Sequence, residues 1–301
     1  MDRCDIYIGG SFQRTEKTLQ VTNPFNNDVF AETYTGGETE LEAAISKAQS
    51  VENVMKGLPS FQRFEILRHV AKTLHKKRDH FARVLAQESG KPLIYTLGEI
   101  DRSSQTFLIA AEESKRLPRE YIGLDWTPSG IDKEGFVKYF PVGLVAGISP
   151  FNFPMNLVAH KIAPAIAAGC PIILKPASST PLSALELAKI IDETPLPKGA
   201  LSIIPMDRRT RMKFVTDERF KLLTFTGSPD VGWKMKKEAG KKKVVLELGG
   251  NAGVIVSGSA DIDFAVKRCI FGGFAYSGQV CIHAQRIFAE RKIFDEFLEK
   301  F

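Results

Sequence analysis

The sequence lacks the patterns that mark metal-binding, disulfide-rich and membrane proteins. Its four cysteines form no CxxC pair, and its five histidines form no HExxH. We therefore expect neither a metal site nor a disulfide framework, which favours a reducing, cytoplasmic location. The longest apolar stretch, residues 162–174, is too short to span a bilayer and contains two prolines. The N-terminal residues MDRCDIYIGGSF carry charge where a signal peptide needs an apolar core.

The sequence also has little excess charge of either sign. Its net charge is +6, and the basic clusters at 75–78, 208–211 and 241–243 are short and free of aromatic residues. Clusters of this kind usually form a solvated face, so we expect no nucleic-acid partner. The length of 301 residues is more than one small core needs and favours two domains.

The order of the elements indicates an α/β protein. Residues 6–35 are typical of short strands with turns, and apolar residues then recur at helical spacing from Glu38 to residue 117. Residues 119–140 are typical of a β-hairpin around a Pro-Ser-Gly turn. Such an arm cannot bury both of its faces alone, so we expect it to pair with another subunit.

Short apolar runs alternate with helical stretches after Pro141. The runs are residues 142–149, 171–176, 200–205, 221–228 and 243–250. This alternation predicts a Rossmann-like parallel sheet with helices on both faces. Ligands bind such sheets outside the carboxyl ends of the strands.

Polar residues follow four of these predicted strands. Asn152, Lys175, Ser228 and Glu247 each come at or just after a strand end. Each has a plain structural explanation: a turn asparagine, a solvated lysine, or a serine that caps a helix beginning at Pro229. Four of them at one edge of one sheet favour a binding site instead.

The common nucleotide-binding motifs are absent. No GxGxxG follows the first predicted strand, and GSPDVGWK has Trp233 where a P-loop has lysine, which excludes a Walker-type ATPase. Gly227 and Ser228, before a helix, still offer backbone N–H groups and a helix dipole to a phosphate.

Five ordered motifs resemble those of the aldehyde dehydrogenase superfamily. PFNFP, LKPASSTPL, FTGSPDVG, LELGGNAGVIV and GQVCIHAQR match its signatures in order, and the similarity covers essentially the whole chain. The spacings agree as well, with 281 − 247 = 34 residues from Glu247 to Cys281 and 175 − 152 = 23 from Asn152 to Lys175. The sequence of residues 240–256 is most similar to that of a bacterial or archaeal branch that includes lactaldehyde dehydrogenases.

The resemblance implies an oxidoreductase that turns a small aldehyde into a carboxylic acid with NADP or NAD. Cys281, otherwise open to interpretation as a buried core thiol, would be the nucleophile that forms a thiohemiacetal and then a thioester. Asn152 and the Cys281 backbone N–H would hold the oxyanion, and Glu247 would activate the hydrolytic water. Branches that transfer the acyl group to coenzyme A typically lack this glutamate. His283, by the same resemblance, is structural. Cys4, Cys170 and Cys269 lie in no such motif, and we expect them to be packing or surface residues.

The resemblance also predicts the cofactor site. The residues that it places against the cofactor are Ile148, Ser149, Pro150, Phe151, Lys175, Ser178, Gly227, Ser228, Val231 and Leu248. NAD-preferring members often carry a glutamate where this chain has Ser178, so we expect NADP to be accepted or preferred. Met206, Asp207 and two arginines replace a glycine-rich turn of the family, and Arg208 or Arg209 would reach a 2′-phosphate or else be solvated.

The family pattern divides the chain into parts. Residues 1–118 and 141–246 would form the cofactor-binding domain, residues 119–140 an oligomerisation arm, and residues 247–301 the beginning of an α/β catalytic domain. Family members continue beyond the position of Phe301, so we expect most of that domain, with an E-x-F-G-P motif, to be missing. The alternatives are an inactive cofactor-binding fragment and a coenzyme A-acylating enzyme. A homo-oligomer, dimeric or tetrameric, is expected of the full-length form.

Overall fold

The computed structural model describes residues 2–301, which divide into two compact units. The first unit runs to Phe225 and includes Met235–Val245, and the second comprises Thr226–Lys234 and Leu246–Phe301. Within the described residues, no helix combines the length and apolar character that crossing a membrane requires.

A seven-stranded sheet has the order β12-β11-β8-β9-β10-β2-β3. The pairings among β8, β9, β10 and β11 are parallel, whereas β2 pairs antiparallel with β10 and with β3. The bounds are β2 Ile6–Ile8, β3 Phe12–Gln13, β8 Val145–Ile148, β9 Ile172–Lys175, β10 Leu201–Ile203, β11 Leu222–Gly227 and β12 Lys243–Leu248. The α/β class and the mostly parallel sheet are confirmed. The addition of β2 and β3 to this sheet was not predicted, because two short strands near the N-terminus carry no signal of their partner.

The strand order places helices on both faces of the sheet. The chain moves in one direction from β8 to β9 to β10 through α6 (Asn156–Ala168) and α7 (Leu182–Asp192), then returns past β8 to β11 through α8 (Arg208–Thr216). Right-handed crossovers therefore put α6 and α7 on one face and α8 on the other. The direction reverses between β8 and β11, which is where open α/β sheets bind their ligands.

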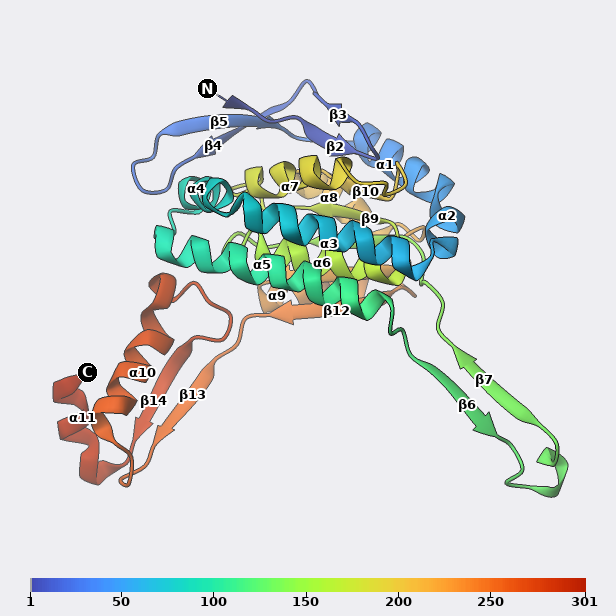
Figure 1. Cartoon of the computed structure of the whole chain (residues 1–301). Coiled ribbons are helices and arrows are strands. Elements are labelled where there is room, and N and C mark those ends of the chain that lie inside the picture. Colours follow the sequence, from blue (N-terminus) through green and yellow to red (C-terminus); the bar gives the residue numbers. More distant parts are fainter. Residues whose placement is uncertain (1) are drawn as a thin grey trace. The chain divides into compact units, whose positions relative to one another are not determined.

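An outer layer of helices covers α6 and α7. It consists of α3 (Ser60–Lys76), α4 (Arg78–Ser89) and α5 (Leu93–Ser114), and Figure 1 shows α3 and α5 side by side over α6. One apolar core joins these layers and includes Leu67, Phe107, Ile162 and Leu185.

The predicted helical stretches are broken at two residues. Val51 separates α1 (Glu38–Ser50) from α2 (Glu52–Gly57), and Lys77 separates α3 from α4. Both residues have ψ near zero, at 1° and 20°. Periodicity alone missed these breaks because neither residue is a glycine or a proline.

A second, three-stranded sheet lies near the N-terminus. Strand β5 (Val29–Tyr34) pairs in parallel with β1 (Asp2–Arg3) and antiparallel with β4 (Thr18–Thr22). The short strands predicted for residues 6–35 are therefore confirmed, although they belong to two different sheets.

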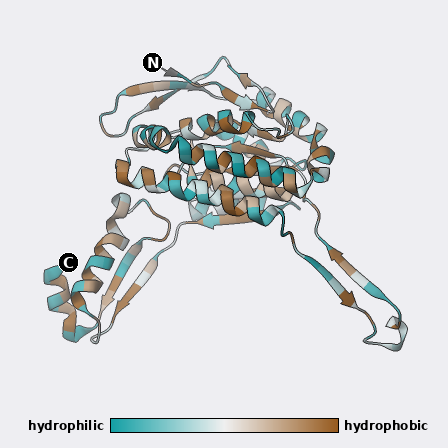
Figure 2. Cartoon of the chain, in the orientation of Figure 1, coloured by the Kyte–Doolittle hydropathy of each residue, from teal (hydrophilic) through white to brown (hydrophobic). Residues whose placement is uncertain are grey.

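Residues 119–138 contain a two-stranded hairpin. Strands β6 (Arg119–Gly123) and β7 (Glu134–Lys138) pair antiparallel, and a 3₁₀ turn spans Pro128–Gly130. Trp126 and Phe136 are 77% and 78% exposed, and Figure 2 shows hydrophobic stretches on both strands. Large apolar side chains left in water on a narrow ribbon are typical of a surface that another chain covers.

The second unit has a small core of its own. Strands β13 (Ala252–Val256) and β14 (Ala284–Ala289) pair in parallel, next to α10 (Ile262–Phe274) and α11 (Phe294–Lys300). Short 3₁₀ segments lie at Ala275–Gly278 and Arg291–Ile293, and α9 spans Pro229–Glu238. Val256, Cys269 and Phe297 belong to the buried cluster, whereas Ile255 and Phe288 are exposed.

A buried carboxylate caps helix α7 from another element. Glu88, near the end of α4, accepts hydrogen bonds from the backbone N–H of Leu182 at 2.7 Å and of Ser183 at 3.2 Å. These are two of the N–H groups that a helix leaves unsatisfied at its N-terminus. Burial nevertheless raises the Glu88 pKa to about 7.

The raised pKa of Glu88 predicts a pH-dependent stability. The folded protein holds this proton more tightly than the unfolded chain, so its contribution is fully present below about pH 4.5 and is lost as the pH rises through about 7. Between pH 5 and 8 we expect the free energy of unfolding to fall by about 2.5 kcal/mol relative to Glu88→Gln, which cannot ionise. Urea unfolding followed by circular dichroism measures this, and parallel pH profiles for the two proteins would rule it out.

Candidate active site

The loop between β8 and α6 carries the predicted oxyanion donor. Ile148 and Ser149 are buried at the end of β8, Pro150 and Asn152 are half-buried, and Phe151 is exposed. The backbone N–H of Ser149 donates to the Lys175 carbonyl at 3.1 Å. The register of the two strands also pairs Ile148 with Lys175. Parallel pairing therefore brings these predicted cofactor residues side by side.

Lys175 is a buried cation at the end of β9. Its Nζ donates to the Pro176 carbonyl at 3.0 Å. Burial, followed by the nearby charge of Arg211, lowers the Lys175 pKa to about 8. Ser178 lies three residues on, exposed in a turn. The pair offers an ammonium and a hydroxyl, both of which can donate to a phosphate or to ribose hydroxyls.

Arg211, on α8, is a candidate cofactor residue that the sequence did not indicate. Its Nε is buried and has no hydrogen-bond partner among residues 2–301. Burial and the charge of Arg208 lower its pKa, with no carboxylate contributing. Arg209, by contrast, is exposed and forms an ion pair with Glu38 at 3.5 Å. Helical spacing was the available signal, because residues 208 and 211 share a face that residue 209 does not.

The departures from the family's glycine-rich turn have structural roles. Asp207 is the N-cap of α8 and accepts from the Thr210 backbone N–H at 2.9 Å. Met206 is buried and forms an isolated parallel β-bridge with Gly36. The turn therefore starts a regular helix, which orients the arginines that follow.

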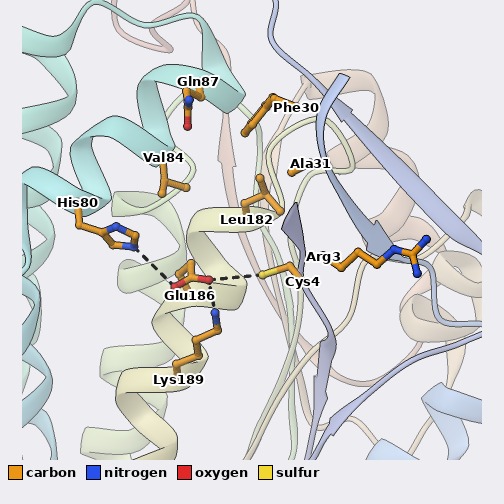
Figure 3. Close-up of a pocket in the computed structure, with 10 residues that line it drawn as sticks. All are labelled: Arg3, Cys4, Phe30, Ala31, His80, Val84, Gln87, Leu182, Glu186 and Lys189. Carbon is orange, nitrogen blue, oxygen red and sulfur yellow. Dashed lines mark hydrogen bonds and ion pairs between the residues drawn. The ribbon is translucent and has the colours of Figure 1, made fainter. Parts of the chain in front are cut away.

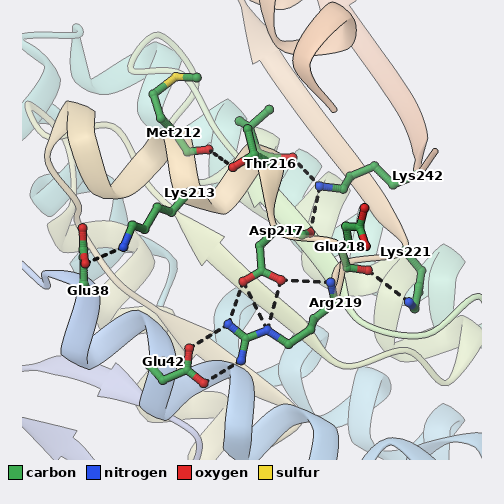
Figure 4. Close-up of polar contacts among 11 residues, drawn as sticks. Glu38, Glu42, Met212, Lys213, Thr216, Asp217, Glu218, Arg219, Lys221 and Lys242 are labelled. Carbon is green, nitrogen blue, oxygen red and sulfur yellow. Dashed lines mark hydrogen bonds and ion pairs between the residues drawn. The ribbon is translucent and has the colours of Figure 1, made fainter. Parts of the chain in front are cut away.

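Cations at the other end of α8 have acceptors among the described residues, either carboxylates or backbone carbonyls. Arg219 binds Glu42 and Asp217 through paired contacts of 2.5 to 3.1 Å, and these bonds raise its pKa (Figure 4). Lys242 donates to the backbone carbonyls of Val215 and Asp217. By contrast, no carboxylate of the described residues is among the causes that shift the pKa of Lys175 or of Arg211.

The first turn of α9 begins where strand β11 ends. Gly227 is the last residue of β11, Pro229 is the first of α9, and Ser228 accepts the first helical bond from Gly232 at 3.0 Å. Ser228 is exposed and Val231 is half-buried. Ser228 therefore occupies the N-cap position, and the helix N-terminus suits an anion.

The segment before Cys281 has an unusual backbone. Tyr276, Ser277 and Gly278 have φ values of 50°, 54° and 72°. Two consecutive non-glycine residues in the left-handed region cost about 1–3 kcal/mol each, and such strain concentrates at functional sites. Gly278 satisfies this backbone requirement, and a Cβ there would also lie 3.3 Å from the Gly273 carbonyl oxygen.

Cys281 and Glu247 belong to the same unit, and their segments are joined. The Gly250 N–H, three residues after Glu247, donates to the Cys281 carbonyl at 3.3 Å, and Gln285 Nε2 donates to the Gly250 carbonyl at 3.0 Å. Both Cys281 and Glu247 are exposed. Leu248, the residue after Glu247, is half-buried. Asn152 lies in the first unit, so the convergence of all three stays a prediction.

The remaining cysteines differ from Cys281 in being buried. Cys4 lines a cavity of about 420 Å³, where its thiol donates to Glu186 at 3.5 Å (Figure 3). Burial and the Glu186 charge raise its pKa to about 12, and burial raises the pKa of Cys170 and Cys269 as well. None of these thiols is poised to form a thiolate.

The Nδ1 atom of His283 is engaged by the backbone rather than by the Cys281 thiol. That nitrogen lies within hydrogen-bonding distance of the Val280 carbonyl, to which it donates in the tautomer protonated there. This contact closes the turn that contains Cys281 and agrees with a structural role.

Residues 12–301 match the model of the aldehyde dehydrogenase family, so the chain belongs to that family. It is 36% identical over 296 residues to 3-sulfolactaldehyde dehydrogenase of Priestia megaterium, covering 98% of this chain and 62% of the relative. It is 38% identical over 301 residues to lactaldehyde dehydrogenase of Methanocaldococcus jannaschii, covering 98% and 64%. The chain thus spans less than two thirds of the length of these relatives.

Solved structures share the fold. Aldehyde dehydrogenase 21 from Physcomitrella patens, in complex with the reaction product succinate, is 44% identical with a TM-score of 0.96, covering 100% of this chain and 63% of that one. The NADP-dependent glyceraldehyde-3-phosphate dehydrogenase from Bacillus halodurans, complexed with NADP, is 27% identical with a TM-score of 0.96, covering 100% and 64%. Betaine aldehyde dehydrogenase from Staphylococcus aureus, in complex with NAD+, is 28% identical with a TM-score of 0.93, covering 98% and 61%.

Proposed function

We propose that the protein containing this chain oxidises a small aldehyde to its carboxylic acid with NAD(P), through a covalent intermediate on Cys281. The observation that carries the proposal is the one exposed cysteine among the four, which follows a left-handed stretch of backbone in a chain of this family. An accessible thiol in a strained loop suits a nucleophile.

The first step would be the attack of the Cys281 thiolate on the aldehyde carbon. The carbonyl oxygen becomes an oxyanion, and a thiohemiacetal forms on the sulfur. The Asn152 side-chain amide and the Cys281 backbone N–H would stabilise that oxyanion. One such donor typically contributes about 3 kcal/mol to transition-state stabilisation.

The second step would release the acid. When bound, the cofactor supplies the hydride acceptor that converts the thiohemiacetal to a thioester. Glu247 would then take a proton from the water that attacks the thioester carbonyl, and the Cys281 thiolate would leave. A glutamate in this role favours hydrolysis over transfer to coenzyme A, which remains the second candidate reaction.

The charge distribution of the first unit supports a phosphate-bearing cofactor. Lys175 and Arg211 are both cationic and partly buried, no carboxylate compensates them, and the Arg211 Nε lacks a partner in the described residues. A 2′-phosphate would supply the missing negative charge and acceptors. Ser178, unlike the glutamate of NAD-preferring members, does not repel it. We propose that NADP is accepted and preferred.

The cofactor proposal predicts the effect of removing one cation. Arg211→Met should raise the KM for NADP by about 10-fold, because a charge-assisted hydrogen bond contributes about 1.5–3 kcal/mol, and should change the KM for NAD little. Arg209→Met is the matched control, since Arg209 pairs with Glu38 at the surface. A wild-type kcat/KM that favours NAD a hundredfold, or equal losses with both cofactors, would contradict it.

The substrate proposal is restricted to small aldehydes. Two relatives are named for lactaldehyde and 3-sulfolactaldehyde, both short chains with a hydroxyl beside the carbonyl. Reduced-cofactor formation from a panel of short aldehydes tests the proposal directly. Cofactor binding without turnover would instead indicate an inactive fragment, and product only with coenzyme A present would indicate the acylating reaction.

We also propose roles for the parts of the chain. Residues 1–118 and 141–246 would form the cofactor-binding domain, residues 247–301 would begin the catalytic domain, and the hairpin of residues 119–140 would contact another subunit. The exposed aromatic residues of the hairpin support the last role.

A further inference from the structure

A buried ion pair joins the start of α5 to the loop that carries Asn152. Lys91 Nζ lies 2.6 Å from Glu99 Oε2, and both side chains are 1% exposed. Lys91 lies between Gly90, the left-handed C-cap of α4, and Pro92, the N-cap of α5. Its backbone is therefore fixed on both sides, and its side chain points away from solvent.

Both ends of the Asn152 loop are bound by this ion pair. Lys91 Nζ donates to the Asn152 carbonyl at 2.7 Å, and its charge lies 4.0 Å from the centre of the Phe153 ring. Glu99 Oε1 accepts from the backbone N–H groups of Met155 at 3.0 Å and Asn156 at 3.1 Å. A single pair of side chains thus holds the loop from residue 152 to residue 156.

The helix that follows the loop depends on the same carboxylate. The N-cap residue of α6, Met155, provides no side-chain cap, so Glu99 replaces it from a different helix. A carboxylate at this position satisfies two unpaired N–H groups and interacts favourably with the helix dipole. The start of α6 therefore cannot shift without breaking charge-assisted hydrogen bonds.

Stability alone gives a weak reason for such a pair. Burying an ammonium and a carboxylate carries a large desolvation penalty. Apolar residues of similar volume often stabilise the folded state as much or more. Burial indeed lowers the Lys91 pKa, against the opposing influence of Glu99. What an apolar pair could not do is fix the carbonyl of Asn152 and two N–H groups at the same time.

We propose that Lys91 and Glu99 are positioning residues that hold the Asn152 backbone so that its side-chain amide meets the oxyanion. This inference rests on the proposed function, in which Asn152 is an oxyanion donor. Neither residue touches the reacting atoms. They keep the Asn152 amide in place, because a hydrogen-bond donor must already be oriented when negative charge develops on the substrate oxygen.

The kinetic test compares three substitutions in the active enzyme. Lys91→Met and Glu99→Gln should each lower kcat at least ~10-fold while changing the dissociation constant of the cofactor less than about 3-fold, because oxyanion donors act in the transition state. Arg78→Met is the matched control. Arg78 forms two hydrogen bonds of 2.7 Å with Asp101, which join α4 to α5. In the described part of the chain, none of the hydrogen bonds or ion pairs of Arg78 and Asp101 reaches the Asn152 loop. The kcat of Arg78→Met should stay within about 2-fold of the wild type, and a loss equal to that of Lys91→Met would overturn the proposal.

A double-mutant cycle separates positioning from general stability. In an Asn152→Ala background, Lys91→Met should change kcat less than about 2-fold, because the donor that it positions is already gone. Independent, additive losses would overturn the proposal. If Asn152→Ala alone leaves kcat unchanged, the oxyanion role in the proposed function fails, which is a different outcome.

Amide hydrogen exchange gives a readout on this chain that needs no turnover. The Met155 and Asn156 amides should exchange at least ~10-fold faster in Lys91→Met and in Glu99→Gln, with no change in Arg78→Met. If Lys91→Met does not fold, Glu99→Gln decides, since it retains one acceptor oxygen. Unchanged exchange at both amides would overturn the positioning of the loop.

Discussion

Cys281→Ser is expected to lower the rate of aldehyde oxidation by at least ~10³-fold, because a hydroxyl is a far weaker nucleophile than a thiolate. Cys281 is exposed, so the substitution removes no buried contact and should leave the fold unchanged. Binding of the cofactor should also remain within a few-fold of the wild type. Reduced-cofactor absorbance measures turnover, and fluorescence titration measures binding.

The matched control for this prediction is a buried cysteine. Cys170→Ala removes a thiol that is 3% exposed, so we expect lower stability and an unchanged kcat. Alkylation of the native protein gives a second readout, because iodoacetamide should modify Cys281 well before the three buried thiols. If Cys281→Ser keeps more than a tenth of the wild-type rate, the cysteine is not the nucleophile.

Glu247→Gln is expected to separate the two halves of the reaction. Without a general base the thioester accumulates, so reduced cofactor should appear in a rapid burst of about one equivalent per active site. Steady-state turnover should then fall by about 10²–10⁴-fold. The amide is nearly the same size as the carboxylate, and residue 247 is exposed, so the effect should not come from unfolding.

The control for Glu247 is another exposed carboxylate of the same unit, outside the proposed site. Glu290 is exposed and belongs to the same unit, where it forms an ion pair with Lys292 at 3.6 Å. Glu290→Gln should therefore retain normal turnover. Loss of the burst itself in Glu247→Gln would mean that the glutamate acts before hydride transfer, which would contradict its assignment to deacylation.

Strand–helix alternation was sufficient to predict most of the fold. Each of the five apolar runs predicted between residues 142 and 250 contains a strand of one sheet, and a helix starts at Pro229, because these features depend on local patterns. The breaks at Val51 and Lys77 and the pairing of β2 with β10 depend on tertiary packing, which periodicity does not encode.

The site could be predicted only where a motif marks it. Cys281, Glu247 and Asn152 lie in motifs that resemble those of the family, whereas Arg211, Lys91 and Glu99 emerged from burial and contacts. Lys91 lies between two helical stretches and Glu99 lies within the second, and nothing in their spacing indicates that both are buried against a loop some 60 residues later. The basic cluster of residues 208–211 predicts Arg208 or Arg209, and not Arg211, for the 2′-phosphate, because the sequence alone does not show which of these side chains is buried.

The most direct test of the account is to identify the covalent intermediate. Glu247→Gln would be mixed with a small aldehyde and oxidised cofactor, quenched in acid, and analysed by intact mass and peptide mapping. If Cys281 is the nucleophile, the adduct has the mass of the aldehyde less one hydride and one proton and lies on the peptide that contains Cys281. An adduct on another cysteine, or reduced cofactor formed with no adduct at any time, would contradict it.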